Sequence, residues 1–198
     1  MKTPNVGRTS MRWVMLLIFL VSGCVARTGS YKEDLEKSGH KHIDAAVLVS
    51  KLKGKTFELS YDGRAIDFCA DRSCYSQVYV YRNSNHLSSV FFGEHWRANF
   101  EFSDGRMCFR DLTSEVSGYE KGCFWFLAPE GFAERQTLSG TIWMYNSSGQ
   151  LHGVISSVRN GAVFIPPTIP LLGYSERKRL YESHAQKAEA YDRADGEA

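Results

Sequence analysis

The dipeptide Asp104-Gly105 is the feature that most restricts the fold of this chain, because alternating apolar and polar residues flank it on both sides. Such alternation is typical of a half-buried β-strand, and Asp-Gly between two alternating runs is a strong hairpin signal. With these two residues in the turn, Phe102 faces Met107, and Phe100 faces Phe109. The pattern predicts a hairpin that turns these apolar side chains toward a core.

Similar runs recur from residue 57 to residue 158, separated by turn residues at Asp62-Gly63, Asn83–Asn85 and Ser147–Gly149. About eight short strands of even spacing indicate an up-and-down meander, and closing a meander removes its exposed edges. We therefore predict a mainly β fold. It is a single antiparallel up-and-down β-barrel of about eight strands, with a short helix before it and one C-terminal helix. The interior of such a barrel is filled by side chains or holds one small ligand.

The first residues have the features of an export signal. Lys2, Arg8 and Arg12 precede an unbroken apolar run from Trp13 to Val21, and no acidic residue lies among them. A basic region, a short apolar core and small residues at the cut are typical of a secretory signal. As a helix the apolar run would span about 14 Å, against about 30 Å of hydrocarbon in a bilayer, so we expect no membrane-spanning helix.

The apolar run leads into Val21-Ser22-Gly23-Cys24, which resembles the lipobox of bacterial lipoproteins. The resemblance implies that residues 1–23 are a lipoprotein signal peptide, that the Cys24 thiol receives diacylglycerol, and that the new amino group is acylated. Two or three acyl chains would hold the protein firmly, because each buried methylene contributes about 0.8 kcal/mol. The alternative is an ordinary signal peptide cut near Ala26, which would discard Cys24.

Loss of the leader also changes the charge of the chain. The formal net charge is +2, and without the three basic residues of the leader 21 basic side chains stand against 22 acidic ones. No block of Lys and Arg of the kind that follows a phosphate backbone is present. We therefore expect no nucleic-acid partner.

After Cys24 an even number of cysteines remains, and in an exported chain this indicates disulfides. Symmetric pairing across the loop after the predicted hairpin sets Cys108 opposite Cys123, at about the 4.5–5.5 Å that suits a disulfide. Proximity in the sequence favours Cys69 with Cys74, and other pairings stay open. The Cys-x4-Cys spacing and the isolated histidines do not match a zinc site, so no metal and no cofactor are predicted.

The segments around the barrel follow from composition. Residues 24–42 are polar and are predicted to form a lipidated tether, in which His40 and His42 are solvated. Residues 43–160 form the barrel domain, which opens with a helix capped by Asp44. Residues 161–198 form an apolar, proline-rich loop and a helix from Ser175 to Ala194.

This C-terminal helix is expected to pack on the barrel wall, and its last residues, Asp195–Ala198, are expected to fray. It would cover outward-facing aromatic side chains, namely Tyr79, Tyr81, Trp125 and Trp143. The alternative is a detached arm that binds another envelope protein.

The barrel segment resembles a family of small, uncharacterised exported bacterial proteins with a lipocalin-like β-barrel. The shared features are Leu52–Thr56, Gly93 with Trp96, Asp104-Gly105 leading to Cys108-Phe109, and Gly122–Phe124. The resemblance implies the fold and brings no catalytic residue.

No catalytic motif is present, and His95 and His152 lie on predicted strands as wall residues, so we predict that the chain is not an enzyme. The expected function is that of a membrane-anchored envelope lipoprotein that binds a small apolar or amphipathic molecule in its barrel. The alternative is a protein-interaction module, either an accessory subunit of an envelope complex or an inhibitor of a wall-degrading enzyme. A filled interior would favour the alternative, and a cavity of a few hundred Å³ would favour the ligand.

Val25 follows the cysteine in place of an aspartate retention signal. By analogy this indicates the periplasmic face of the outer membrane, so the expected location is the bacterial cell envelope.

Overall fold

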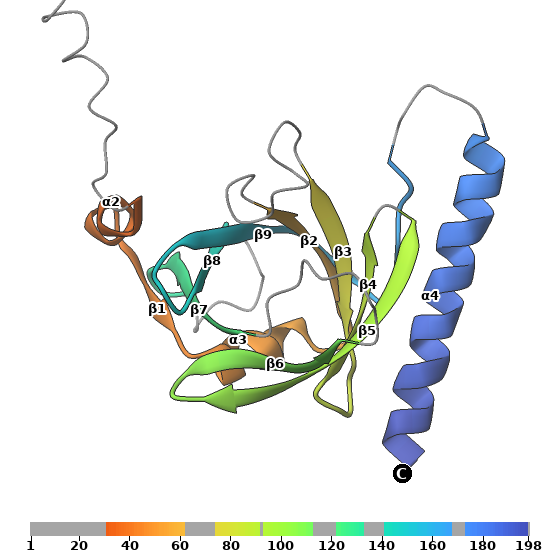
Figure 1. Ribbon diagram of the computed structural model, residues 1–198, viewed down its shortest axis with the longest axis horizontal. Coiled ribbons are helices and arrows are strands. Elements are labelled where there is room, and N and C mark those ends of the chain that lie inside the picture. Colours follow the sequence, from red (N-terminus) through yellow and green to blue (C-terminus); the bar gives the residue numbers. More distant parts are fainter. Residues whose placement is uncertain are drawn as a thin grey trace, which may run out of the picture.

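The computed structural model describes residues 31–61, 74–91, 93–112, 122–132, 141–167 and 173–197. In these ranges the chain forms one nine-stranded sheet and three helices (Figure 1). The elements in order are α2 (Tyr31–Lys37), β1 (His40–Ile43), α3 (Ala45–Leu52), β2 (Lys55–Tyr61), β3 (Tyr75–Val80), β4 (His86–Phe91), β5 (Glu94–Ser103), β6 (Arg106–Leu112), β7 (Cys123–Pro129), β8 (Ile142–Asn146), β9 (Leu151–Asn160) and α4 (Tyr174–Glu197).

Strands β2 to β9 close into an antiparallel barrel. Each of these strands pairs with the next along the chain, and β9 pairs with β2 to complete the ring. Helices α2 and α3 precede the barrel and α4 follows it, and the ring of strands lies between α2 and α4 in Figure 1. The predicted fold class, a mainly β chain with a closed barrel of about eight strands, is confirmed.

The Asp104-Gly105 hairpin has the register that the sequence predicts. Phe102 pairs with Met107 and Phe100 pairs with Phe109. Both turn residues have positive φ, 52° and 72°, as a type I′ turn requires. The next pairing sets Cys108 opposite Cys123, and these two cysteines form a disulfide.

The sheet has one strand that the sequence analysis does not predict. β1 lies within the residues expected to form the tether, and it pairs with β7 from Ile43↔Phe126 to His40↔Pro129. The edge of β7 is available to β1 because β6 pairs with only the first two residues of β7. Since the segment is mostly polar, no alternation in its sequence marks it as a strand.

Helix α3 joins the barrel core. The Asp44 side chain accepts hydrogen bonds from the backbone N–H groups of Ala46 and Val47, which confirms the predicted cap. The backbone N–H of Ala45 donates to the carbonyl of Gly105 at 3.0 Å, so the helix begins against the hairpin turn. Its buried residues Ala45, Leu48, Val49 and Leu52 belong to the same apolar cluster as the barrel side chains.

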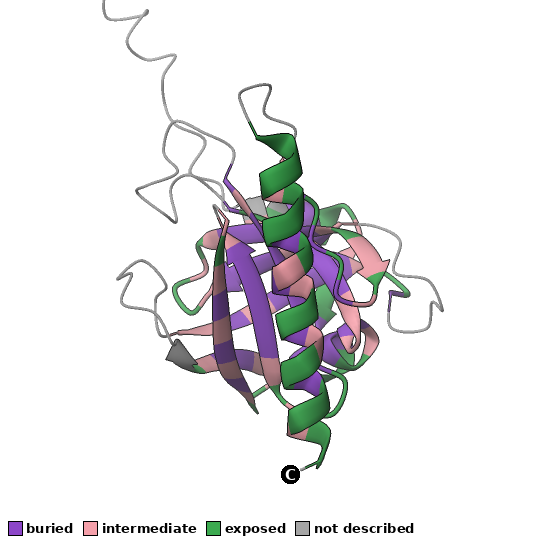
Figure 2. Cartoon of the chain, turned by 90° about the vertical axis from the view of Figure 1, so that its right-hand side faces the viewer, coloured by how far each residue is buried: buried purple, intermediate pink, exposed green. Residues whose placement is uncertain are grey.

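Two separate helices cover the outward-facing aromatic residues. α4 packs on the wall of β3, β4 and β5, as Figure 2 shows, and it buries Tyr79 and Tyr81 completely. Trp125 and Trp143 instead pack in a cluster with Leu35 of α2. Because β8 and β4 are four strands apart in either direction around the ring, the two helices lie on opposite walls.

The expected fraying after Ala194 is wrong. α4 continues to Glu197, because Arg97 donates two hydrogen bonds to the Asp195 carboxylate at 2.7 and 2.9 Å. A charged partner on the barrel therefore orders the last turn.

Several predicted features lie outside the described residues. They are Cys24, Cys69 and the turn Asp62-Gly63 with the strand expected at Ile66–Phe68. Cys74 is disulfide-bonded, and its partner also lies outside these ranges. None of the described helices is long and apolar enough to cross a bilayer.

Replacement of both Cys108 and Cys123 by alanine should lower the free energy of unfolding by about 3 kcal/mol, the value expected for a loop of this length. Urea unfolding of the oxidised protein and of the double variant measures the difference. Peptide mapping without reductant should recover the Cys108–Cys123 peptide, whereas free thiols at both positions would refute the strand register.

Candidate functional site

The interior of the barrel is almost filled. Large side chains that include Trp96, Phe100, Phe124 and Phe126 are buried there, and the cavity they leave has a volume of only about 50 Å³. Pockets for small ligands usually measure roughly 300–1,000 Å³, whereas a water needs about 10–15 Å³. The interior can therefore hold a few waters and is too small for a lipid or a cofactor.

Two buried polar side chains line this cavity, His152 and Ser89. The His152 ring lies 4.6 Å from the ring of Phe124 and 5.6 Å from that of Tyr61, measured between centroids. Burial lowers the pKa of His152 to about 4, so its imidazole is neutral at neutral pH. No carboxylate is among the described residues that line the cavity, and nothing there orients His152 as a general base.

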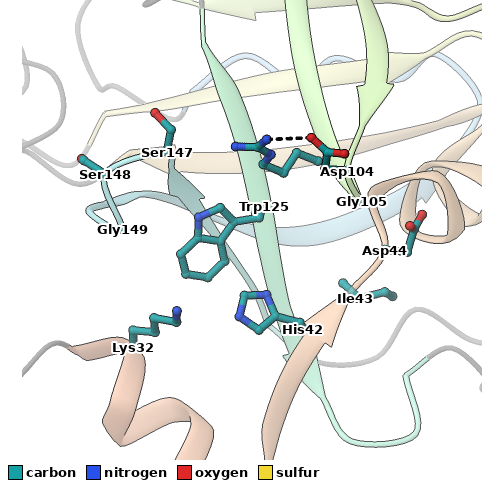
Figure 3. Close-up of a pocket in the computed structure, with 11 residues that line it drawn as sticks. Lys32, His42, Ile43, Asp44, Asp104, Gly105, Trp125, Ser147, Ser148 and Gly149 are labelled. Atoms are coloured by element: carbon teal, nitrogen blue, oxygen red, sulfur yellow. Dashed lines mark hydrogen bonds and ion pairs between the residues drawn. The ribbon is translucent and has the colours of Figure 1, made fainter.

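A groove on the outside of the barrel has a volume of about 480 Å³ (Figure 3). It lies between α2, the end of β1, the β5–β6 turn, β7 and the β8–β9 turn. The lining residues are Lys32, His42, Ile43, Asp44, Asp104, Gly105, Arg106, Trp125, Ser147, Ser148 and Gly149.

Trp125 forms the aromatic wall of this groove. Its indole ring stacks on Tyr145 with centroids 4.5 Å apart and planes at 7°. Nζ of Lys32 lies 4.5 Å from the indole centroid, and the His42 ring lies 4.7 Å away. Three elements therefore fix the indole, and burial together with the Lys32 charge lowers the pKa of His42.

The opposite rim of the groove carries paired charges. Nη2 of Arg106 donates to the Asp104 carboxylate at 3.1 Å, and this pair is exposed to solvent. Exposed pairs contribute about 0–1 kcal/mol, so a ligand can replace either partner at low cost. The groove thus offers an indole edge, hydroxyls and charges of both signs, a composition that suits a polypeptide.

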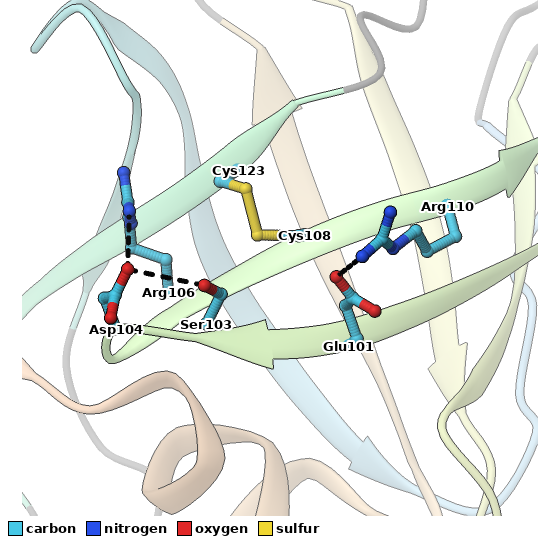
Figure 4. The surroundings of a disulfide bond; sticks show 7 residues. All are labelled: Glu101, Ser103, Asp104, Arg106, Cys108, Arg110 and Cys123. Atoms are coloured by element: carbon cyan, nitrogen blue, oxygen red, sulfur yellow. Dashed lines mark hydrogen bonds and ion pairs between the residues drawn. A yellow bond between two sulfur atoms is a disulfide. The ribbon is translucent and has the colours of Figure 1, made fainter.

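The Cys108–Cys123 disulfide links two of the strands that form the groove (Figure 4). It links β6 to β7 two residues from Arg106 and two from Trp125. Next to it, an ion pair between Arg110 and Glu101 joins β6 to β5. The disulfide therefore joins the strands that carry Arg106 and Trp125, and the ion pair joins β6 to β5.

The sequence analysis did not identify this groove. Lys32 and His42 lie in the segment predicted to be a tether, and the sequence predicts of Trp125 only that it faces outward. Nδ1 of His40 contacts the Ser38 hydroxyl at 3.1 Å instead of sharing a site with His42. Within the described ranges no three metal-ligating side chains come together.

Comparison with protein-family models, curated proteins and solved structures finds no match to this chain. The lipobox and the resemblance to small exported barrel proteins therefore stay predictions from the sequence.

Acid should destabilise the barrel through His152. The folded protein holds the His152 pKa near 4, while the unfolded chain has the ordinary value of 6.5, so the unfolded state binds more protons between these values. Stability is therefore full above pH 6.5 and falls by about 3 kcal/mol as the pH decreases to 4. Urea unfolding at several pH values measures the slope.

His152→Leu should remove this share of the pH dependence, while His40→Leu at the surface should keep it. An unchanged slope in His152→Leu would show that the imidazole is not buried as described.

Proposed function

We propose that this chain is a noncatalytic lipoprotein of the bacterial envelope, anchored through Cys24, that acts as a protein-interaction module. The observation that carries the proposal is the filled interior, whose cavity of about 50 Å³ is several-fold below the size of a small-ligand pocket. A barrel of this kind acts through its outer surface. We therefore favour a protein-interaction module over a protein that binds a small apolar ligand, which is the function expected first from the sequence.

The groove beside Trp125 is the surface we assign to the partner. Its composition, an indole at the floor with exposed charges at the rim, matches the usual anatomy of protein interfaces. Trp and Arg, both present here, are the residue types that most often dominate binding energy. The partner that fits is a polypeptide segment with its own charges at the edge and an apolar group at the centre.

The proposed anchor favours a partner in the same envelope layer. Lys32 lies eight residues after Cys24, so a fully extended chain of that length spans at most about 29 Å. The groove would then stay close to the membrane surface, and an accessory subunit of a membrane complex fits this position better than an inhibitor of a diffusing enzyme.

Cys24→Ala should abolish incorporation of a palmitate analogue and leave a protein of precursor size. The thiol is the acceptor of the first acyl group, so without it neither lipidation nor the cleavage that follows can occur. Metabolic labelling with mass spectrometry of the extracted protein gives the result. Label retained in Cys24→Ala would remove the lipoprotein proposal.

A photo-crosslinking amino acid in place of His42 should give one discrete polypeptide adduct in intact cells. The same residue in place of Ser60, which is exposed on β2, should not give that adduct. Native mass spectrometry of the detergent-extracted protein should show no bound small molecule. Equal adducts from both positions, or a retained small amphipathic molecule, would contradict the proposal.

A further inference from the structure

Helix α4 is held to the barrel wall mainly by polar contacts near its C-terminal end. The buried Asp192 carboxylate accepts from the Tyr79 hydroxyl and from the backbone N–H of Arg82, both at 2.7 Å. Asp195 accepts from Arg97 and also contacts His86. Apolar contact is limited, because Tyr181 and Ala188 are the buried apolar residues of the helix.

The middle of this contact is occupied by two histidines that face each other. The rings of His95 on β5 and His184 on α4 stack with centroids 5.4 Å apart and planes at 18°. Nε2 of His184 donates to the Gly93 carbonyl at 2.9 Å. Nδ1 of His184 and Nε2 of His95 are buried and have no hydrogen-bond partner among the described residues.

Among the described residues, the ionisable groups that face His95 are cationic or neutral. From α4 they are His184, Lys187 and Tyr191, and Arg97 follows on the same face of β5. On β4 the residue paired with His95 is Val90, which carries no charge. Burial, then the charges of His184 and Lys187, lower the pKa of His95 to about 4. The docked helix therefore requires an uncharged His95.

We propose that α4 is a releasable cover: uptake of a proton by His95 undocks the helix and exposes the apolar wall formed by Tyr79, Tyr81 and Val90. A protonated imidazole would lie half-buried beside a second imidazole and the Lys187 ammonium, and within the described part of the chain no carboxylate faces it. In the undocked state the same imidazole is solvated. This switch does not depend on the lipid anchor or on the groove beside Trp125.

The charge pattern of α4 makes the helix depend on docking. Near the positive end of the helix dipole α4 carries one acidic residue, Glu176, against three basic ones, Arg177, Lys178 and Arg179, and its last turn has no basic residue. Asp195 and Glu197 lie at the negative end instead. Because this order is unfavourable in an isolated helix, release of α4 should also unfold it.

The Asp195 carboxylate near the end of α4 is not the sensor. Burial raises the pKa of Asp195, but hydrogen bonds from Arg97, His86 and Ser84 outweigh this, and the net pKa lies below the ordinary value. Asp195 therefore stays ionised at pH 5.

Hydrogen–deuterium exchange of the full protein in detergent at pH 7.5 and pH 5.0 tests the proposal. With a His95 pKa of about 4 when docked and 6.5 when free, the docking equilibrium should fall about 30-fold at pH 5.0. After correction for intrinsic rates, protection of α4 amides should drop by this factor in a His152→Gln background, in which strands β2 to β9 lose the acid sensitivity of His152 and stay protected. Unchanged protection of α4 at pH 5.0 would overturn the proposal.

Three variants separate the switch from general acid instability. His95→Gln should remove the pH effect on α4, whereas His152→Gln, which alters the barrel interior, should keep it. Lys187→Gln, on the surface of α4, should reduce the drop without removing it. A drop of wild-type size in His95→Gln would assign the effect to another group and refute the proposal.

Discussion

The rest of the structure depends on the seam at which β2 pairs with β9, because this pairing turns an open meander into a closed barrel. The two strands are about a hundred residues apart in the sequence, so the seam forms only after the other strands have found their partners. Gly153 is required there, since a Cβ at this position would lie 2.8 Å from the Ser60 carbonyl oxygen. Nη2 of Arg159 also contacts the Glu58 carboxylate at 2.5 Å across the seam.

The seam also directs the chain that follows it. The Thr56 hydroxyl donates to the Gly161 carbonyl at 2.7 Å and accepts from the backbone N–H of Val163 at 3.0 Å. The Gln77 side-chain amide then binds both the N–H and the carbonyl of Ile165. Polar side chains of β2 and β3 thus hold residues 161–165 along the wall of the barrel. Barrel closure and the course of residues 161–165 are therefore consequences of the same pairing.

Features that depend on neighbours in the sequence could be predicted from it. The Asp104-Gly105 turn fixes the register of its hairpin, and that register places Cys108 opposite Cys123. Strand β1 was missed because its fourth residue, Ile43, is its only apolar one, and its pairing depends on how early β6 leaves β7. The groove and the histidine pair join side chains from distant segments, so no local spacing marks them.

The order at the end of α4 could not be predicted from the residues of that segment alone. A carboxylate near the end of a chain is usually solvated, and no residue close to Asp195 in the sequence indicates that Arg97 is its partner. The pairing exists because Arg97 and His95 are two residues apart on β5, so both side chains point outward from the same face of the strand. The same strand face therefore carries both a contact that holds the helix and a contact that protonation can break. Since α4 contributes few buried apolar residues, it should be the least stable unit of the fold, and a small change in its charge balance can move it without disturbing the barrel.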